Sequence, residues 1–102
     1  MNELNAFVGN YLNAIISKVF KILPMKETDE DSLPVYLDSL YMELTGSVHV
    51  FSLLENDAAY ITLVSLVRAL RDDPSVNIQV VRREVFHSIS ICQKLIEKYG
   101  TR

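Results

Sequence analysis

His49, His87 and Cys92 are the histidine and cysteine residues of this chain, and therefore its first candidates for metal binding or nucleophilic chemistry. A metal site needs several such ligands, or carboxylates, converging on one point. His87 and Cys92 are five positions apart, which places them about 140° apart around a helix and prevents them from sharing a metal within it. We expect Cys92 to be a core side chain, His87 to lie on the surface and His49 to be half-buried. The sequence therefore predicts no metal and no cofactor.

Catalysis by serine or by paired carboxylates has little support in the sequence. The serines are scattered, and none lies in a predicted strand-to-helix turn. The glycines, at positions 9, 46 and 100, are too far apart to form a phosphate-binding loop. Carboxylates gather in the run 26–32 and at Asp72 and Asp73, where helix capping and turn formation explain them. Docking of a basic partner or a metal on the acidic run is the alternative, and we predict that the chain is not an enzyme.

Four arginines are the best candidates for contact with nucleic acid or an acidic partner. Arg82 and Arg83 follow a predicted turn, and Arg68 and Arg71 precede it. The segment 76–85 resembles the start of the recognition helix in helix-turn-helix proteins, which implies a DNA-binding regulator as an alternative function. The sequence departs from that pattern at Asp72 and Asp73, which put negative charge beside the expected phosphate contacts. We expect the arginines to be solvated or paired with nearby carboxylates.

Tyrosines provide the second set of candidate contact residues. A tyrosine suits a half-wet interface because it combines an apolar ring with a polar tip. The predicted helix 58–71 is apolar on most sides, which is typical of a central or interface helix. We therefore expect protein contact, in the form of a homodimer or of binding to another protein. The candidate interface residues are Tyr11, Tyr36, Tyr41, Tyr60 and Tyr99.

The composition is that of one folded, soluble domain spanning 1–102. Of the 102 residues, 49% are apolar and 23% charged, which supplies a packed core. The mean hydropathy of +0.15 is high for a small domain and favours self-association. A net charge of −3 makes nucleic acid or anionic lipid an improbable partner. The single cysteine is typical of a reducing compartment, so we predict a cytoplasmic protein, and polar residues within 4–23 argue against a membrane span.

Apolar residues recur at intervals of three and four along most of the chain, as in amphipathic helices. Pro24 should end the first helix, whose length would be roughly 30 Å. The second stripe runs through Gly46, where either two helices cross closely or the helix breaks; we interpret it as one helix to about Leu54. The predicted helices cover 4–23, 36–54, 58–71 and 78–99.

Polar residues and glycine mark the expected helix ends. Asp31 or Ser32 can cap the second helix and Asp57 the third. Residues 72–75 form a turn, and Gly100 should close the last helix as a C-cap.

Two segments also fit short strands, because residues 47–52 and 75–81 are rich in β-branched side chains. A mixed α/β fold is therefore the alternative to an all-α bundle of four, possibly five, antiparallel helices with short loops. Small bacterial immunity proteins and phage accessory proteins are often helical bundles of this size, an analogy of architecture alone. We expect a small cytoplasmic interaction or regulatory module that acts through protein contact.

Overall fold

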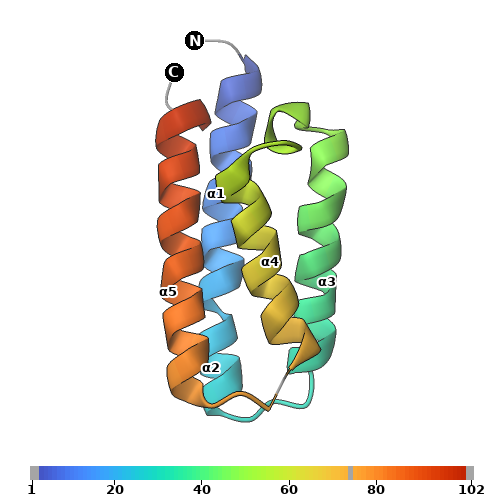
Figure 1. The fold of residues 1–102 in the computed structure, drawn as a ribbon, viewed down its shortest axis with the longest axis vertical. Coiled ribbons are helices and arrows are strands. Elements are labelled where there is room, and N and C mark those ends of the chain that lie inside the picture. Colours follow the sequence, from blue (N-terminus) through green and yellow to red (C-terminus); the bar gives the residue numbers. More distant parts are fainter. Residues whose placement is uncertain (1–2, 74, 101–102) are drawn as a thin grey trace.

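The computed structural model describes residues 3–73 and 75–100 as an antiparallel helical bundle measuring 42 × 21 × 20 Å (Figure 1). The all-α prediction is confirmed, and the described residues contain no strand. Pro74, within the predicted turn 72–75, lies outside the described residues. The α-helices are α1 (Glu3–Phe20), α2 (Ile22–Glu27), α3 (Leu33–Gly46), α4 (Ala58–Asp72) and α5 (Ile78–Leu95).

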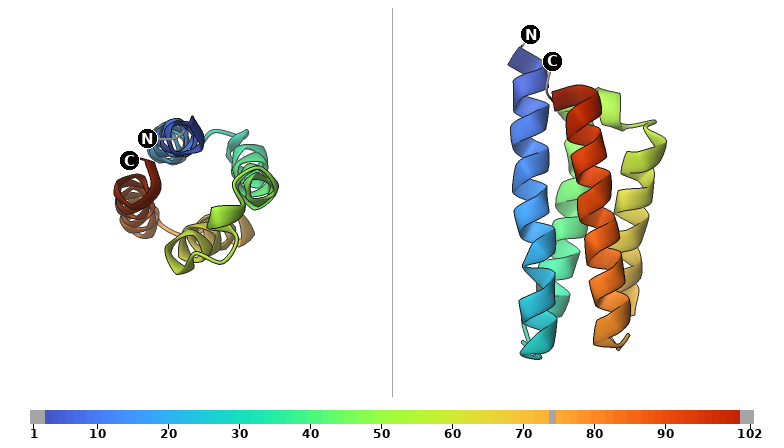
Figure 2. Two further views of the ribbon diagram at one scale, coloured as in Figure 1. Left: turned by 90° about the horizontal axis from the view of Figure 1, so that it is seen from above. Right: turned by 90° about the vertical axis from the view of Figure 1, so that its left-hand side faces the viewer.

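Seen from above, the helices form a ring (Figure 2). Their buried apolar side chains form one core. The ring runs from α1 to α5, then α4, then α3, and α2 continues α1 along the same side. Each α-helix of the ring packs closely on its neighbours except at the α1–α3 seam. No helix in the described ranges is long and apolar enough to cross a membrane.

The first helical segment extends past the proline that was expected to end it. Pro24 lies inside α2, as its third residue. Its missing amide cannot bond to the carbonyl of Phe20, so the regular helix is interrupted around Lys21. The Lys21 and Met25 amides still bond to carbonyls four residues earlier, at 3.2 and 3.3 Å, so the chain direction is preserved.

The prediction of one helix to Leu54 is wrong, because α3 ends at Gly46. Two short 3₁₀ turns follow, at Ser47–His49 and Ser52–Leu54. Close helix crossing does not explain Gly46, since a Cβ there would meet nothing within 4 Å. The strand alternative is not supported either: the segment 47–52 is largely 3₁₀, and from Ile78 the segment 75–81 is α-helix.

Side-chain caps begin two of the helices. Asp57 accepts hydrogen bonds from the amides of Ala59 and Tyr60 at the start of α4, which confirms its predicted role. The Asn77 side chain caps α5 by accepting a hydrogen bond from the Val80 amide, at 3.0 Å. Ser32 occupies the cap position of α3 but makes no side-chain cap bond, so its predicted contribution is wrong.

The core is built from the apolar stripes of all four sides of the ring. Cys92 is fully buried within it, as predicted. The last turn, the π-helical Ile96–Gly100, packs against α1 through a glycine–glycine contact. A Cβ on Gly100 would lie 2.7 Å from Cα of Gly9. Gly100 has no positive φ, so its role is this close approach and not the predicted left-handed cap.

Candidate functional site

The α4 arginines both face carboxylates of the same chain. Arg71 lies 3.5 Å from Asp38 and 3.0 Å from Asp72, and its guanidinium sits 4.2 Å from the centre of the Tyr41 ring. Arg68 is more loosely placed, 3.6 Å from Asp72 and largely exposed. Arg71 therefore joins α3 to α4, whereas Arg68 keeps most of its surface free.

The α5 arginines lie on a different part of the bundle and are also paired. Arg82 reaches Glu27 of α2 at 3.8 Å, and Arg83 contacts Glu84 at 2.9 Å. Both guanidinium groups belong to the first turns of an 18-residue helix, longer than the short recognition helix suggested by the helix-turn-helix resemblance. The structure thus distributes the four arginines over two helices, each arginine with a carboxylate neighbour.

Three of the candidate interface tyrosines form polar contacts within the chain. The Tyr36 hydroxyl donates to the Lys18 carbonyl at 2.7 Å, and Tyr41 lies under Arg71. The Tyr99 hydroxyl donates to Asp57 at 2.5 Å. All three tyrosines remain partly exposed at the bundle surface.

Tyr60 is buried within the chain, with only 1% of its surface exposed. Its hydroxyl donates to the Leu44 carbonyl at 2.5 Å and lies 2.5 Å from the Ser47 hydroxyl. The Tyr11 hydroxyl is buried and has no hydrogen-bond partner of ordinary geometry in the described residues. Burial raises the pKa of both Tyr11 and Tyr60. Both hydroxyls therefore stay neutral, and that of Tyr60 holds the end of α3 against α4.

Asp57 joins the start of α4 to the C-terminal turn. Its side chain is 2% exposed and accepts hydrogen bonds from Lys98, at 2.9 Å, and Tyr99. Burial alone would raise the pKa of Asp57. The hydrogen bonds from Tyr99, Lys98 and the Tyr60 amide, together with the Lys98 charge, outweigh burial and hold this pKa below its usual value. The carboxylate is therefore a charged structural clamp.

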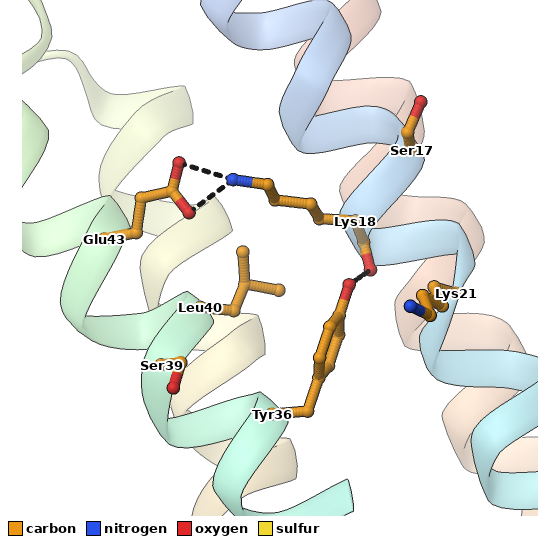
Figure 3. Close-up of a pocket in the computed structure, with 7 residues that line it drawn as sticks. All are labelled: Ser17, Lys18, Lys21, Tyr36, Ser39, Leu40 and Glu43. Atoms are coloured by element: carbon orange, nitrogen blue, oxygen red, sulfur yellow. Dashed lines mark hydrogen bonds and ion pairs between the residues drawn. The ribbon is translucent and has the colours of Figure 1, made fainter.

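A hollow of about 420 Å³ lies at the α1–α3 seam (Figure 3). Lys18 reaches across it to both carboxylate oxygens of Glu43, at 2.8 and 2.9 Å. Tyr36 and Leu40 provide the apolar walls, and the ammonium of Lys21 lies 5.7 Å from the centre of the Tyr36 ring. Ser17 and Ser39 complete the lining. The ion pair spans the seam, and the negative charge of Glu43 offsets the positive charge of Lys18.

A second groove of about 240 Å³ runs between α3 and α4. Its residues are mostly apolar. Two are charged: Glu55, just before α4, and Arg68, within α4. We call this groove, together with the exposed side chains of Val35, Met42 and Ile61 on its two helices, the α3–α4 face. The groove is lined by Tyr41, Leu44, Thr45, Val48, Glu55, Tyr60, Ile61, Val64, Ser65 and Arg68.

Large apolar side chains are exposed on more than one side of the bundle. On the α1–α5 side, Phe20 and Phe86 are each about half exposed and touch edge to face, with ring centres 6.1 Å apart. Tyr11, in the middle of α1, packs against Phe51 with ring centres 5.3 Å apart and ring planes tilted by 35°. The exposed set is Phe7, Phe20, Val35, Met42, Val50, Ile61 and Phe86.

The remaining chemically reactive candidates are not brought together. Burial raises the pKa of the Cys92 thiol to about 12. His87 is exposed, as predicted, whereas the prediction that His49 is half-buried is wrong, because it lies exposed in the 3₁₀ turn after α3. Within the described ranges, no three histidine, cysteine or carboxylate side chains lie close enough to hold a metal, and this includes the acidic run at its described positions.

Sequence reasoning named Tyr36, Tyr41, Tyr60 and Arg68, which line the two grooves, but missed the other lining residues. Lys18 and Glu43 are 25 positions apart in the sequence, so no local sequence pattern indicates that they form a pair. Val35 and Met42, by contrast, are seven positions apart and fall opposite the buried stripe of α3, so helical phase could have identified them. The same test applied to α4 would have singled out Ile61.

Comparisons with protein-family models, with curated proteins and with solved structures found no match to this chain.

Proposed function

We propose that this protein is a small self-associating interaction module that works through protein contact, without a catalytic step of its own. The observation that carries the proposal is the set of seven large apolar side chains left about half or more exposed on a domain whose core is already filled. Single exposed apolar residues are ordinary on protein surfaces. Here Ile61 lines an apolar groove between α3 and α4, and Val35 and Met42 are exposed on the outer side of α3. Exposed apolar side chains beside a groove are typical of contact sites.

The size of the effect favours reversible association. Covering the exposed part of one such side chain stabilises a complex by about 1–2 kcal/mol. Three of them on each of two copies would supply about 6–12 kcal/mol, against an association cost of about 4–15 kcal/mol. The two ranges overlap, so these side chains support a weak, reversible dimer whose dissociation constant is at best about micromolar. Reversible association suits a regulatory module.

A cytoplasmic setting is part of the proposal and rests on the chain's one cysteine, Cys92, which is buried and unpaired. Reversible contact in a reducing compartment needs no disulfide to hold the copies together.

Light scattering after size exclusion, from about 1 to 200 μM and at moderate salt, tests the proposal. We expect the mass to rise from one chain toward two across this range. A constant monomeric mass would contradict self-association. Circular dichroism and a cooperative thermal transition would confirm that the sample is folded and that any added mass is not aggregate.

A further inference from the structure

The α3–α4 face combines exposed apolar side chains with a groove that can receive them. Ile61 is 51% exposed and lines the groove, and Met42 is 63% exposed on the outer side of α3. Tyr41 on α3, Val48 in the 3₁₀ turn that follows it and Val64 on α4 lie partly buried in the groove walls. The face therefore offers both a projecting side chain and a hollow on the same surface.

Charges of opposite sign stand toward the two ends of α4 on this face. Glu55 lies just before the helix, and Arg68 lies near its last turns; both line the same groove. The side chain of Arg68 is 64% exposed, and its contact with Asp72, at 3.6 Å, is loose. Ile61 lies close to midway between the two charges along the chain.

This arrangement is self-complementary under a two-fold rotation. If two copies place their α4 helices antiparallel with the axis beside Ile61, Glu55 of one copy faces Arg68 of the partner subunit, and the reverse pair forms by symmetry. The apolar side chains then meet at the centre with charges at the rim, the usual anatomy of a protein interface.

We propose that the α3–α4 face binds a second copy of this chain, with antiparallel α4 helices and paired Glu55–Arg68 contacts. This proposal rests on the self-association argued above and specifies its surface and geometry. The Phe20–Phe86 cluster is the weaker candidate, because its two rings already cover part of each other and line neither of the two grooves described above.

Charge reversal tests the geometry directly. Arg68→Glu puts two carboxylates opposite each other at both ends of the interface, and we expect the dimer dissociation constant to rise about tenfold. Glu55→Arg should weaken the dimer similarly. The double variant restores opposite charges and should return the constant to within about threefold of the original. Arg83→Glu makes the same charge change on α5, away from this face, and should leave dimerisation unchanged.

The outcomes separate this proposal from the broader one. If the wild-type protein dimerises and Arg68→Glu leaves the dissociation constant unchanged, this face is wrong although self-association stands. The same holds for the antiparallel register if the double variant does not restore the dissociation constant. A wild-type protein that remains monomeric would overturn both proposals.

A cross-link provides a second measurement that does not depend on charge. Ile61→Cys places a thiol beside the two-fold axis, so mild oxidation should join two copies through this position while buried Cys92 stays unreactive. His87→Cys, exposed on α5, is the control and should cross-link much more slowly. Equal rates for the two variants would contradict the proposed axis.

Discussion

Replacing Asp57 with alanine should be among the most damaging single changes in this protein. The carboxylate accepts the first amides of α4 and two side chains of the C-terminal turn, so its loss acts on both. The alanine would leave orphan amides at the helix start. It would also leave the Tyr99 hydroxyl without its acceptor.

The magnitude follows from the contacts that disappear. Loss of the helix cap costs about 1 kcal/mol. Loss of a hydrogen bond between Tyr99 and a charged, buried acceptor costs about 1.5–3 kcal/mol. Because the Lys98 side chain is exposed, we add nothing for it. The free energy of unfolding should therefore fall by about 2–4 kcal/mol, and the melting temperature by roughly 10–25 °C.

Urea titration followed by circular dichroism would measure this loss, with Asp57→Asn as the matched variant. Asparagine is a good helix cap but carries no charge, so it should retain part of the stability. Tyr99→Phe should reproduce the part due to the hydroxyl. If Asp57→Ala changed the unfolding free energy by less than about 0.5 kcal/mol, the clamp described above would be wrong.

The pH dependence supplies an independent check with a defined sign. The pKa of Asp57 is lower in the folded state than its usual value of about 3.9. Its ionised form therefore adds stability above that value, which is lost as the pH falls through the folded pKa. The wild-type protein should lose more stability than Asp57→Asn between about pH 5 and 2. Identical slopes for the two proteins would refute the assignment.

The remaining predictions concern packing, reactivity and charge. Gly100→Ala should cost about 1–3 kcal/mol of stability, because its Cβ would overlap the α1 backbone, whereas Gly46→Ala, with open space and helical φ, should be neutral or stabilising; equal melting temperatures would contradict the close contact. Cys92 should react with a thiol reagent only as fast as the protein opens, so rapid labelling of folded protein would contradict its burial. Fluorescence anisotropy should show no binding to random duplex DNA at low salt; salt-dependent binding lost in an Arg82→Ala, Arg83→Ala variant would instead support the nucleic-acid alternative.

Local features of the chain were predictable because their causes are local. The 3,4 spacing of apolar residues places the buried stripes on the correct faces, and the capping role of Asp57 depends only on residues up to three positions away. The burial of Cys92 follows from the same spacing.

The end of α3 shows where periodicity misleads. Val48, Phe51 and Leu54 continue the apolar spacing and do pack against the core, yet they do so from 3₁₀ turns and the loop between them. Spacing reports which residues face inward over a turn or two. It does not report whether the backbone remains α-helical while they do so.

The sequence likewise did not show which residues each tyrosine contacts within the chain. Tyr60 is enclosed in the core, whereas Tyr36 contacts α1, and Tyr41 and Tyr99 contact opposite ends of α4. Each placement depends on which helix lies beside it.

The sequence by itself determined the helical class, the stripes that form the core and the start of α4, because these depend on interactions between residues a few positions apart. Only the tertiary structure decided which charges meet, how Gly9 and Gly100 come into contact, and where the two grooves open. Those features depend on the order of helices around the ring and on their relative rotation. Both are set by packing all the side chains at once.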